Sequence, residues 1–133
     1  MKILGIGVDI VENKRIQKSI KNPLFTKRIY TPKELKQSKA AHNKVSYFSK
    51  RFAGKEAFWK AISPNKDNTL HFNEIEILYN ENVKPYVHLI GRTKNRVSDL
   101  EKKLNCKFNF HISISDEKPH ALAFVIIFLA HLN

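Results

Sequence analysis

Hydrophobic and polar residues alternate along several stretches of the chain, and a period of two is typical of β-strands. Residues 2–11, 70–79 and 107–115 follow this pattern, and a further strand is predicted over 85–90. Residues 120–129 are apolar almost throughout, which predicts a strand that is central in its sheet or lies at a subunit contact. Helical spacing and capping signals instead predict helices at 12–20, 31–41, 44–62 and 92–104. Antiparallel strands mixed with segregated helices indicate an α+β fold.

The long helix predicted over 44–62 contains the most chemically varied stretch of the chain, RFAGKEAFWKAI at 51–62. At about 100° per residue its aromatic and its small side chains fall on different sides. The two sets are Phe48, Phe52 and Trp59, and Ala53, Ala57 and Ala61. Glu56 and Lys60 lie one turn apart on the border between these sides. Taken alone, they fit a surface ion pair worth about 0.2–0.5 kcal/mol better than a metal or phosphate site.

The first strand places two glycines directly before a carboxylate. Gly5, Gly7 and Asp9 share one face of this strand, and glycine within a strand often marks the close approach of a ligand or another backbone. The alternative is a tight packing site at which Asp9 begins a turn. Further along, Thr31-Pro32-Lys33-Glu34 has the pattern of a capping box at a helix start.

A third polar group follows one face of the strand at 107–115, where His111, Ser113 and Ser115 alternate with apolar residues. A magnesium ion can be bound by two protein carboxylates, such as Asp9 and Glu56, when substrate phosphates supply its other ligands. A nearby lysine would neutralise phosphate charge, and the histidine and serines could donate to phosphate oxygens. The set therefore favours magnesium-assisted phosphoryl-group chemistry over Ser-His-Asp hydrolysis, since no nucleophile elbow is present.

Composition limits the class of protein. The 133 residues fit a single domain, 1–133, and no run reaches the ~20 apolar residues of a membrane span. One cysteine, Cys106, excludes an internal disulfide and a cysteine-based zinc site. The N-terminus lacks a cleavage signal, so we expect a cytoplasmic protein without a membrane partner. The net charge of +12 predicts a polyanionic partner, which leaves nucleic acid, an acidic protein and a phosphate-rich ligand open.

Six segments in order give the chain a specific resemblance. They are GIGVDIVENKRI at 5–16, the pattern F25, R28-x-Y30-T31-x-x-E34, RFAGKEAFWKA at 51–61, FNEIEI at 72–77, KPYVHLIG at 84–91 and HISIS at 111–115. Together they resemble the holo-[acyl-carrier-protein] synthase family of 4'-phosphopantetheinyl transferases. The resemblance implies an antiparallel sheet with one long helix packed against it, and a homotrimer with sites between subunits. It also implies magnesium-dependent transfer of phosphopantetheine from coenzyme A to a serine of apo acyl carrier protein, for fatty-acid synthesis.

The resemblance assigns roles residue by residue. It makes Asp9 and Glu56 the magnesium ligands and Lys60 the pyrophosphate contact, and it counts these three as the catalytic residues. The general base is then Glu56 or a water on the metal. Residues implied to bind coenzyme A are Lys44, Arg51, Lys60, His111 and Ser113. Residues implied to bind the acidic carrier protein, rather than nucleic acid, are Arg15, Lys18 and Arg28.

Two departures from the family pattern weigh on this assignment. Ile62-Ser63-Pro64-Asn65 replaces a glycine-rich segment that the family usually has beside the nucleotide. Asp116 replaces the second histidine of the family's His-x-Ser-x-Ser-His segment, where an acid would repel phosphate unless magnesium or Lys118 offsets it. The competing hypotheses are a basic nucleic-acid-binding module and a family member with impaired activity.

Overall fold

The computed structural model describes residues 2–62 and 70–132. Its elements combine helices with antiparallel strands, which confirms the predicted α+β class. In chain order they are β1 (Lys2–Glu12), α1 (Asn13–Ser19), α2 (Pro23–Ile29), α3 (Pro32–Ser38), α4 (Lys44–Ile62), the 3-10 turn η1 (Phe72–Glu74), β2 (Ile75–Tyr79), β3 (Pro85–Leu89), α5 (Gly91–Leu104), β4 (Cys106–Glu117) and β5 (His120–His131).

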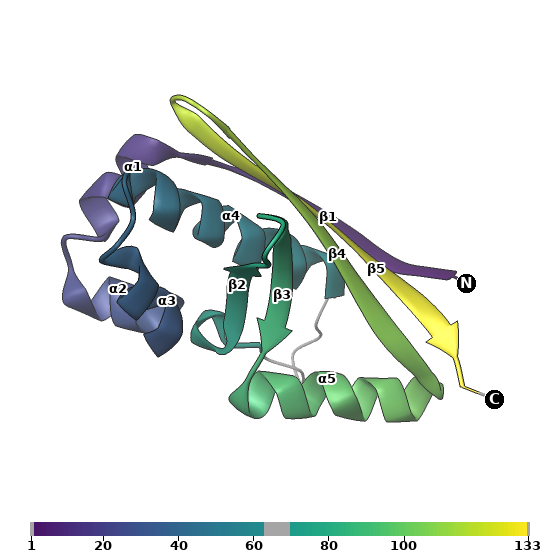
Figure 1. Cartoon of the computed structure of the whole chain (residues 1–133). Helices are drawn as coiled ribbons and strands as arrows, with labels where there is room; N and C mark the ends of the chain where they lie inside the picture. The colour runs from purple at the N-terminus through teal and green to yellow at the C-terminus, as the bar shows by residue number, and fades with distance from the viewer. Residues whose placement is uncertain (1, 63–69, 133) are drawn as a thin grey trace.

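The strands form two antiparallel sheets. The larger sheet has the order β1-β5-β4, and the smaller one pairs β2 with β3. β5 is the central strand, as its continuous apolar sequence predicts. β1 and β5 run side by side along nearly their whole length, so both chain ends lie at the same end of the large sheet (Figure 1).

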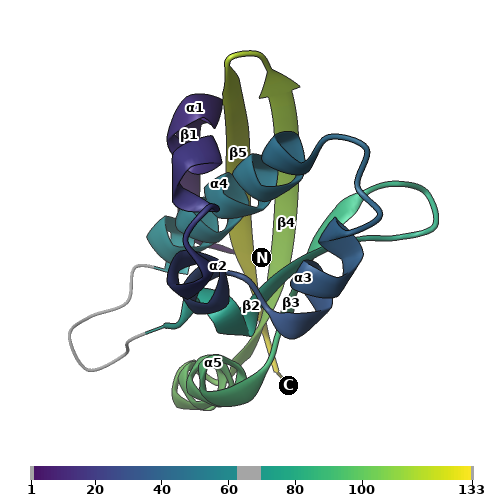
Figure 2. The same cartoon turned by 90° about the vertical axis from the view of Figure 1, so that its left-hand side faces the viewer.

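Helix α4 crosses one face of the large sheet, and both views show it lying along β1, β5 and β4 (Figures 1 and 2). Its alanine stripe faces β1, because a Cβ added at Gly5 would overlap the carbonyl oxygen of Ala61, and one at Gly7 that of Ala57. The glycines of β1 therefore let strand and helix backbones touch. This confirms that the stripe is a close-packing face, and it brings the strand that carries Asp9 against the helix.

The opposite face of the large sheet, which we call the outer apolar face, is not covered by any described element. Its exposed apolar side chains alternate with the buried ones on β1 and β5. They are Ile6, Val8, Ile10, Leu122 and Phe124. The hydrophobic alternation of β1 thus points away from α4, and the glycine face points toward it.

Four sequence expectations need correction. The strand predicted over 70–79 starts only at Ile75, after the turn η1. Gly91 does not only end β3: its positive φ of 61° begins α5, where Glu74 accepts from Arg92 N at 2.7 Å. β4 continues past Ser115 to Glu117 because these residues still pair with β5. Leu104, which helical spacing places on the inward side of α5 with Val97 and Leu100, is 44% exposed at the last position of the helix.

The predicted capping box is present at the start of α3. Thr31 Oγ1 accepts from Glu34 N at 3.2 Å, and Glu34 Oε1 accepts from Thr31 N at 2.9 Å. The polar loop predicted at 64–68 lies outside the described residues. Within the part of the chain that is described, no helix is long and apolar enough to cross a membrane.

Candidate active site

Asp9 and Lys60 meet where β1 passes the last turn of α4. Asp9 lies on the glycine face of β1, and its Oδ1 is 3.2 Å from Lys60 Nζ. The same ammonium donates to the carbonyl of Val8 at 3.0 Å. The close approach that Gly5 and Gly7 allow therefore brings a strand carboxylate to a helix lysine more than fifty residues away in the chain.

Glu56 joins this pair from one turn earlier on α4. Burial raises the pKa of its carboxyl, and the Asp9 carboxylate raises that pKa further, while Lys60 and Arg15 lower it. Two carboxylates that repel each other across a helix–strand contact form a site that would gain from a cation. Asp9, Glu56 and Lys60 thus form one electrostatic cluster, and the sequence prediction that joined them is supported by their placement.

Arg15 lies next to this cluster on α1. Its guanidinium carbon is 5.4 Å from the centre of the Phe52 ring, so the side chain rests on α4 while remaining exposed. Lys18 is exposed in the last turn of α1, and Arg28 is exposed in the last turn of α2. Of these three cations, Arg15 acts on Glu56 by lowering the pKa of its carboxyl, whereas Arg28 borders a surface pocket with His71 and Asn73.

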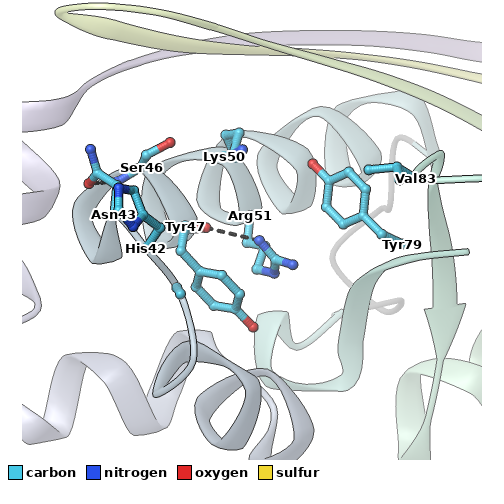
Figure 3. A pocket seen from close by; sticks show the side chains of 9 residues that line it. His42, Asn43, Ser46, Tyr47, Lys50, Arg51, Tyr79 and Val83 are labelled. Atoms are coloured by element: carbon cyan, nitrogen blue, oxygen red, sulfur yellow. Dashed lines mark hydrogen bonds between the residues drawn. The ribbon is translucent and has the colours of Figure 1, made fainter.

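Arg51 occupies a separate site near the start of α4. A cavity of about 380 Å³ opens there, and Figure 3 shows the guanidinium between the rings of Tyr47 and Tyr79. The guanidinium carbon is 3.5 Å from the Tyr47 ring centre and 5.3 Å from that of Tyr79. Arg51 Nη1 donates to the carbonyl of Tyr47 at 3.3 Å, but the buried Nε has no hydrogen-bond partner among the described residues. The other side chains on the cavity wall include His42, Asn43, Ser46 and Lys50.

The two tyrosines are neutral neighbours of this arginine. Burial raises the pKa of Tyr47 to about 12, and burial likewise raises that of Tyr79. Their rings hold the guanidinium by cation–π contact without neutralising its charge. The sequence gives one signal for this arrangement, since Tyr47 precedes Arg51 by four residues on one helix. The contribution of Tyr79, from β2, has no local signal and was missed. Lys44, expected to assist Arg51, is exposed at the first position of α4.

His111 and Ser113 lie on the other face of the large sheet. They pair with Ile126 and Phe124 of β5, whose neighbours Ala123, Val125 and Ile127 are the buried, α4-facing residues. The His111 ring packs edge-on against Phe128, with ring centres 5.4 Å apart. Asp9 faces α4 and Glu56 lies on α4, so His111 and Ser113 are not brought together with these two carboxylates within one chain. Successive side chains of a strand point to opposite faces of the sheet. The alternation of β4 therefore shows that His111 and Ser113 share a face, but not that this face is the one away from α4.

Asp116 is tied to the first turn of α4. Its carboxylate accepts a hydrogen bond from Ser46 Oγ, and Asn43 Oδ1 accepts from Ser46 N at 3.0 Å. A carboxylate is favourable beside the positive end of a helix. The hairpin between β4 and β5 is therefore fastened to the start of α4, beside the Arg51 cavity.

Known proteins share this sequence pattern and fold. Residues 5–125 match the sequence profile of the 4'-phosphopantetheinyl transferase superfamily. Holo-[acyl-carrier-protein] synthase from Pelagibacter ubique is 46% identical over 127 residues, covering 96% of this chain and 98% of that protein. The crystal structure of holo-[acyl-carrier-protein] synthase from Neisseria meningitidis has a TM-score of 0.81 and 36% identity, and covers 95% of this chain and 98% of its own. A holo-(acyl-carrier-protein) synthase from Bacillus anthracis in complex with CoA (3',5'-ADP) has a TM-score of 0.76 and 29% identity. The match covers 96% of this chain and 97% of that one.

Proposed function

Because the chain belongs to the 4'-phosphopantetheinyl transferase superfamily, we propose that it transfers 4'-phosphopantetheine from coenzyme A to a serine of apo acyl carrier protein. The observation that carries this proposal is the meeting of Asp9, Glu56 and Lys60 between β1 and α4. The products are holo acyl carrier protein and adenosine 3',5'-bisphosphate. Such a carrier serves fatty-acid synthesis, which places the enzyme in the cytoplasm.

Magnesium fits the donor set of this site. Asp9 and Glu56 offer carboxylate oxygens, the ligands that magnesium prefers, and their mutual repulsion leaves negative charge for a cation to offset. No group of three or more His, Cys, Asp or Glu gathers in the described ranges 2–62 and 70–132, at this site or at another. Two carboxylates suffice when substrate phosphates complete the shell. Bound magnesium would supply charge stabilisation at the pyrophosphate.

The protein's own residues then position the reactants. Lys60 lies beside Asp9 and would contact the pyrophosphate oxygens, where its positive charge opposes the charge that develops during transfer. The carrier serine oxygen attacks the β-phosphorus, and the bond from that phosphorus to the bridging oxygen breaks. The serine proton leaves to a base as adenosine 3',5'-bisphosphate departs. The base would be Glu56, which lies beside Asp9 and Lys60, or a water on the metal.

The Arg51 cavity is the proposed site for the adenosine 3'-phosphate. Its buried guanidinium keeps one N–H donor unpartnered, and Lys50 and His42 add basic groups on the wall. Arginine presents several donors in a rigid fork that suits phosphate. Lys44 stands exposed at the helix start, where it can approach the same phosphate from solvent.

His111 and Ser113 would serve the site of a neighbouring subunit. They face away from Asp9 of their own chain and border a second cavity of about 370 Å³ with Lys84. The outer apolar face next to them is exposed in the single chain, and burial of such a face against other copies is favourable. We therefore propose a homotrimer with coenzyme A bound between subunits.

The carrier protein would approach from α1 and α2. Arg15, Lys18 and Arg28 are exposed on that side, and the chain carries a net charge of +12. Acyl carrier proteins are acidic, so electrostatic steering raises the encounter rate. An acidic carrier, rather than a nucleic acid, is therefore the proposed partner of this positive charge.

Mass spectrometry of the carrier tests the function. Apo acyl carrier protein incubated with the enzyme, coenzyme A and magnesium should gain the mass of one phosphopantetheine on its serine. A matched reaction with chelator should give no gain. Absence of transfer together with salt-sensitive binding to DNA or RNA would favour a nucleic-acid-binding module. Coenzyme A binding without transfer would instead indicate impaired activity.

A further inference from the structure

Lys55 carries an ammonium group that lies wholly inside the protein. Its Nζ atom is 2.6 Å from Glu34 Oε1, and it donates to the carbonyl of Phe72 at 2.8 Å and to the carbonyl of Ile75. These acceptors use all three N–H groups of the ammonium. Lys55 therefore has no donor left for a substrate, although it directly precedes Glu56 in the chain.

Glu34 extends this contact to three elements. Its Oε1 accepts from Thr31 N at the start of α3, and its Oε2 accepts from Ile77 N of β2 at 2.9 Å. Lys55 belongs to α4. The ion pair thus fastens the consecutive helices α3 and α4 to the more distant strand β2.

The pair holds α4 on the side away from β1. At about 100° per residue, Lys55 and Ala57 point in nearly opposite directions around the helix. Ala57 and Ala61 touch the glycines of β1, whereas Lys55 reaches into η1 and β2. Glu56 lies between these two contacts, so its direction depends on how α4 is rotated about its own axis.

Stability alone does not call for this arrangement. Replacing both members of a buried ion pair by well-packed neutral groups is often neutral or stabilising. The pair instead fixes the orientation of α4. The Lys55 ammonium has three fixed acceptors and the Glu34 carboxylate has three fixed donors, and together they allow one rotation of the helix about its axis.

We infer that Lys55 and Glu34 are positioning residues whose buried ion pair fixes the rotation of α4, so that Glu56 faces Asp9 and Lys60 lies against it. The inference rests on the proposed role of Asp9 and Glu56 as metal-binding carboxylates. With side chains roughly 6 Å from a helix axis, a rotation of about 10° moves a carboxylate by about 1 Å. A misplacement of about 1 Å can cost a reaction ~100-fold.

The test uses a double variant that keeps the shape and removes both charges, Lys55→Met with Glu34→Gln. Binding of Mn²⁺ to the full chain with coenzyme A is measured by electron paramagnetic resonance, beside thermal unfolding and transfer kinetics. We expect the Mn²⁺ dissociation constant to rise about 10–100-fold, the range found when groups that orient metal ligands are lost. kcat for transfer should fall with it.

Thr93→Val is the matched control for lost stability. Thr93 is fully buried on α5, where its Oγ1 accepts from His71 N at 3.0 Å and donates to Glu74 Oε1 at 3.3 Å, and these hydrogen bonds involve neither Lys55 nor Glu56. This variant should unfold at a lower temperature and bind Mn²⁺ as the parent does. If the double variant does not fold, Glu34→Asp decides in its place, because it keeps both charges but shortens the carboxylate arm, with an expected loss of Mn²⁺ affinity of about 10-fold.

Asp9→Asn separates failure of this inference from failure of the proposed function. Loss of Mn²⁺ binding in Asp9→Asn, with unchanged Mn²⁺ affinity and kcat in the folded double variant, would show a purely structural ion pair and overturn the inference. Unchanged Mn²⁺ binding in Asp9→Asn would instead overturn the metal site itself, and the positioning role with it.

Discussion

Helix α4 makes an ion pair on each of two sides, and the two differ in almost every respect. Lys55–Glu34 is 0% exposed on both side chains and 2.6 Å long. Lys60–Asp9 is 3.2 Å long, and its side chains are 47% and 17% exposed. The first pair is surrounded by fixed backbone partners, whereas the second stands beside another carboxylate, Glu56, that repels Asp9.

This difference separates a structural contact from a functional one. The buried pair has every hydrogen-bonding position of its lysine filled, so it can orient the helix but can bind nothing further. The exposed pair keeps an unfavourable contact between carboxylates, which a bound cation would relieve. Functional sites commonly keep such unfavourable contacts at a cost in stability. The predictions below test whether the two sides of α4 behave this differently.

The largest effect is expected at the exposed side. Asp9→Ala or Glu56→Ala removes one of two carboxylates that would hold magnesium, so transfer to the carrier should fall by at least ~100-fold. Circular dichroism and thermal unfolding should remain close to those of the parent, since neither residue lies in the core. Full activity in either variant would refute the metal assignment.

The next effect concerns stability, for which the buried Lys55–Glu34 pair should matter more than the exposed Lys60–Asp9 pair. Lys55→Met leaves the Glu34 carboxylate buried without its cation and should cost about 3–5 kcal/mol in the free energy of unfolding. Lys60→Met removes a half-exposed cation and should cost about 1 kcal/mol or less. Urea denaturation compares the two. Equal costs would contradict the distinction between a structural and a functional pair.

The contact between the glycines of β1 and helix α4 is expected to affect both stability and transfer activity. In Gly7→Ala the new methyl overlaps the carbonyl oxygen of Ala57, so strand and helix must separate. We expect a loss of about 1–3 kcal/mol in stability from overpacking. Transfer should fall about 10-fold or more, because Asp9 moves away from Glu56 and Lys60. Leu104→Val at the exposed end of α5 is the control, and it should leave both measurements nearly unchanged.

Much of this arrangement follows from local sequence signals. Thr31 and Glu34 have the spacing of a capping box, and Gly5 and Gly7 mark a close backbone approach before Asp9. Helical spacing places Glu56 and Lys60 one turn apart. These signals depend only on neighbours in the chain, and the structure contains each of them.

The remaining features depend on contacts between distant segments. A lysine such as Lys55 in a charged helix is ordinarily solvated, and only the packing of η1, β2 and α3 around it makes it a core residue. The alternation of β4 separates His111 from Phe110, but it does not say which face α4 covers. The Tyr79 wall of the Arg51 cavity likewise comes from a strand with no local relation to α4.

A smaller effect is expected at the border of the exposed cluster. Arg15→Glu places a negative charge where an acidic carrier would approach, so the KM for the carrier should rise about 10-fold, equal to ~1.4 kcal/mol. The KM for coenzyme A should change little, because Arg15 is on α1 and the Arg51 cavity is elsewhere. Lys102→Glu, on α5, serves as the charge-matched control. An unchanged KM for the carrier in Arg15→Glu would remove this residue from the carrier-binding surface.

The smallest effect is the pH dependence that Glu56 brings to stability. Its folded-state pKa is raised above the ordinary 4.5 by burial and by Asp9, so the folded protein binds more protons than the unfolded chain in the window just above that value. Stability therefore falls as pH rises through this window, and the loss persists at neutral pH. Glu56→Gln removes this loss and should raise the unfolding midpoint by about 1–3 °C at pH 7, with no gain near pH 4. Differential scanning calorimetry in metal-free buffer measures the unfolding midpoints of the parent and Glu56→Gln at both pH values. A gain of the same size at both pH values would mean that the charge of Glu56 is not its source, and the contrast between the two sides of α4 would lose its electrostatic basis.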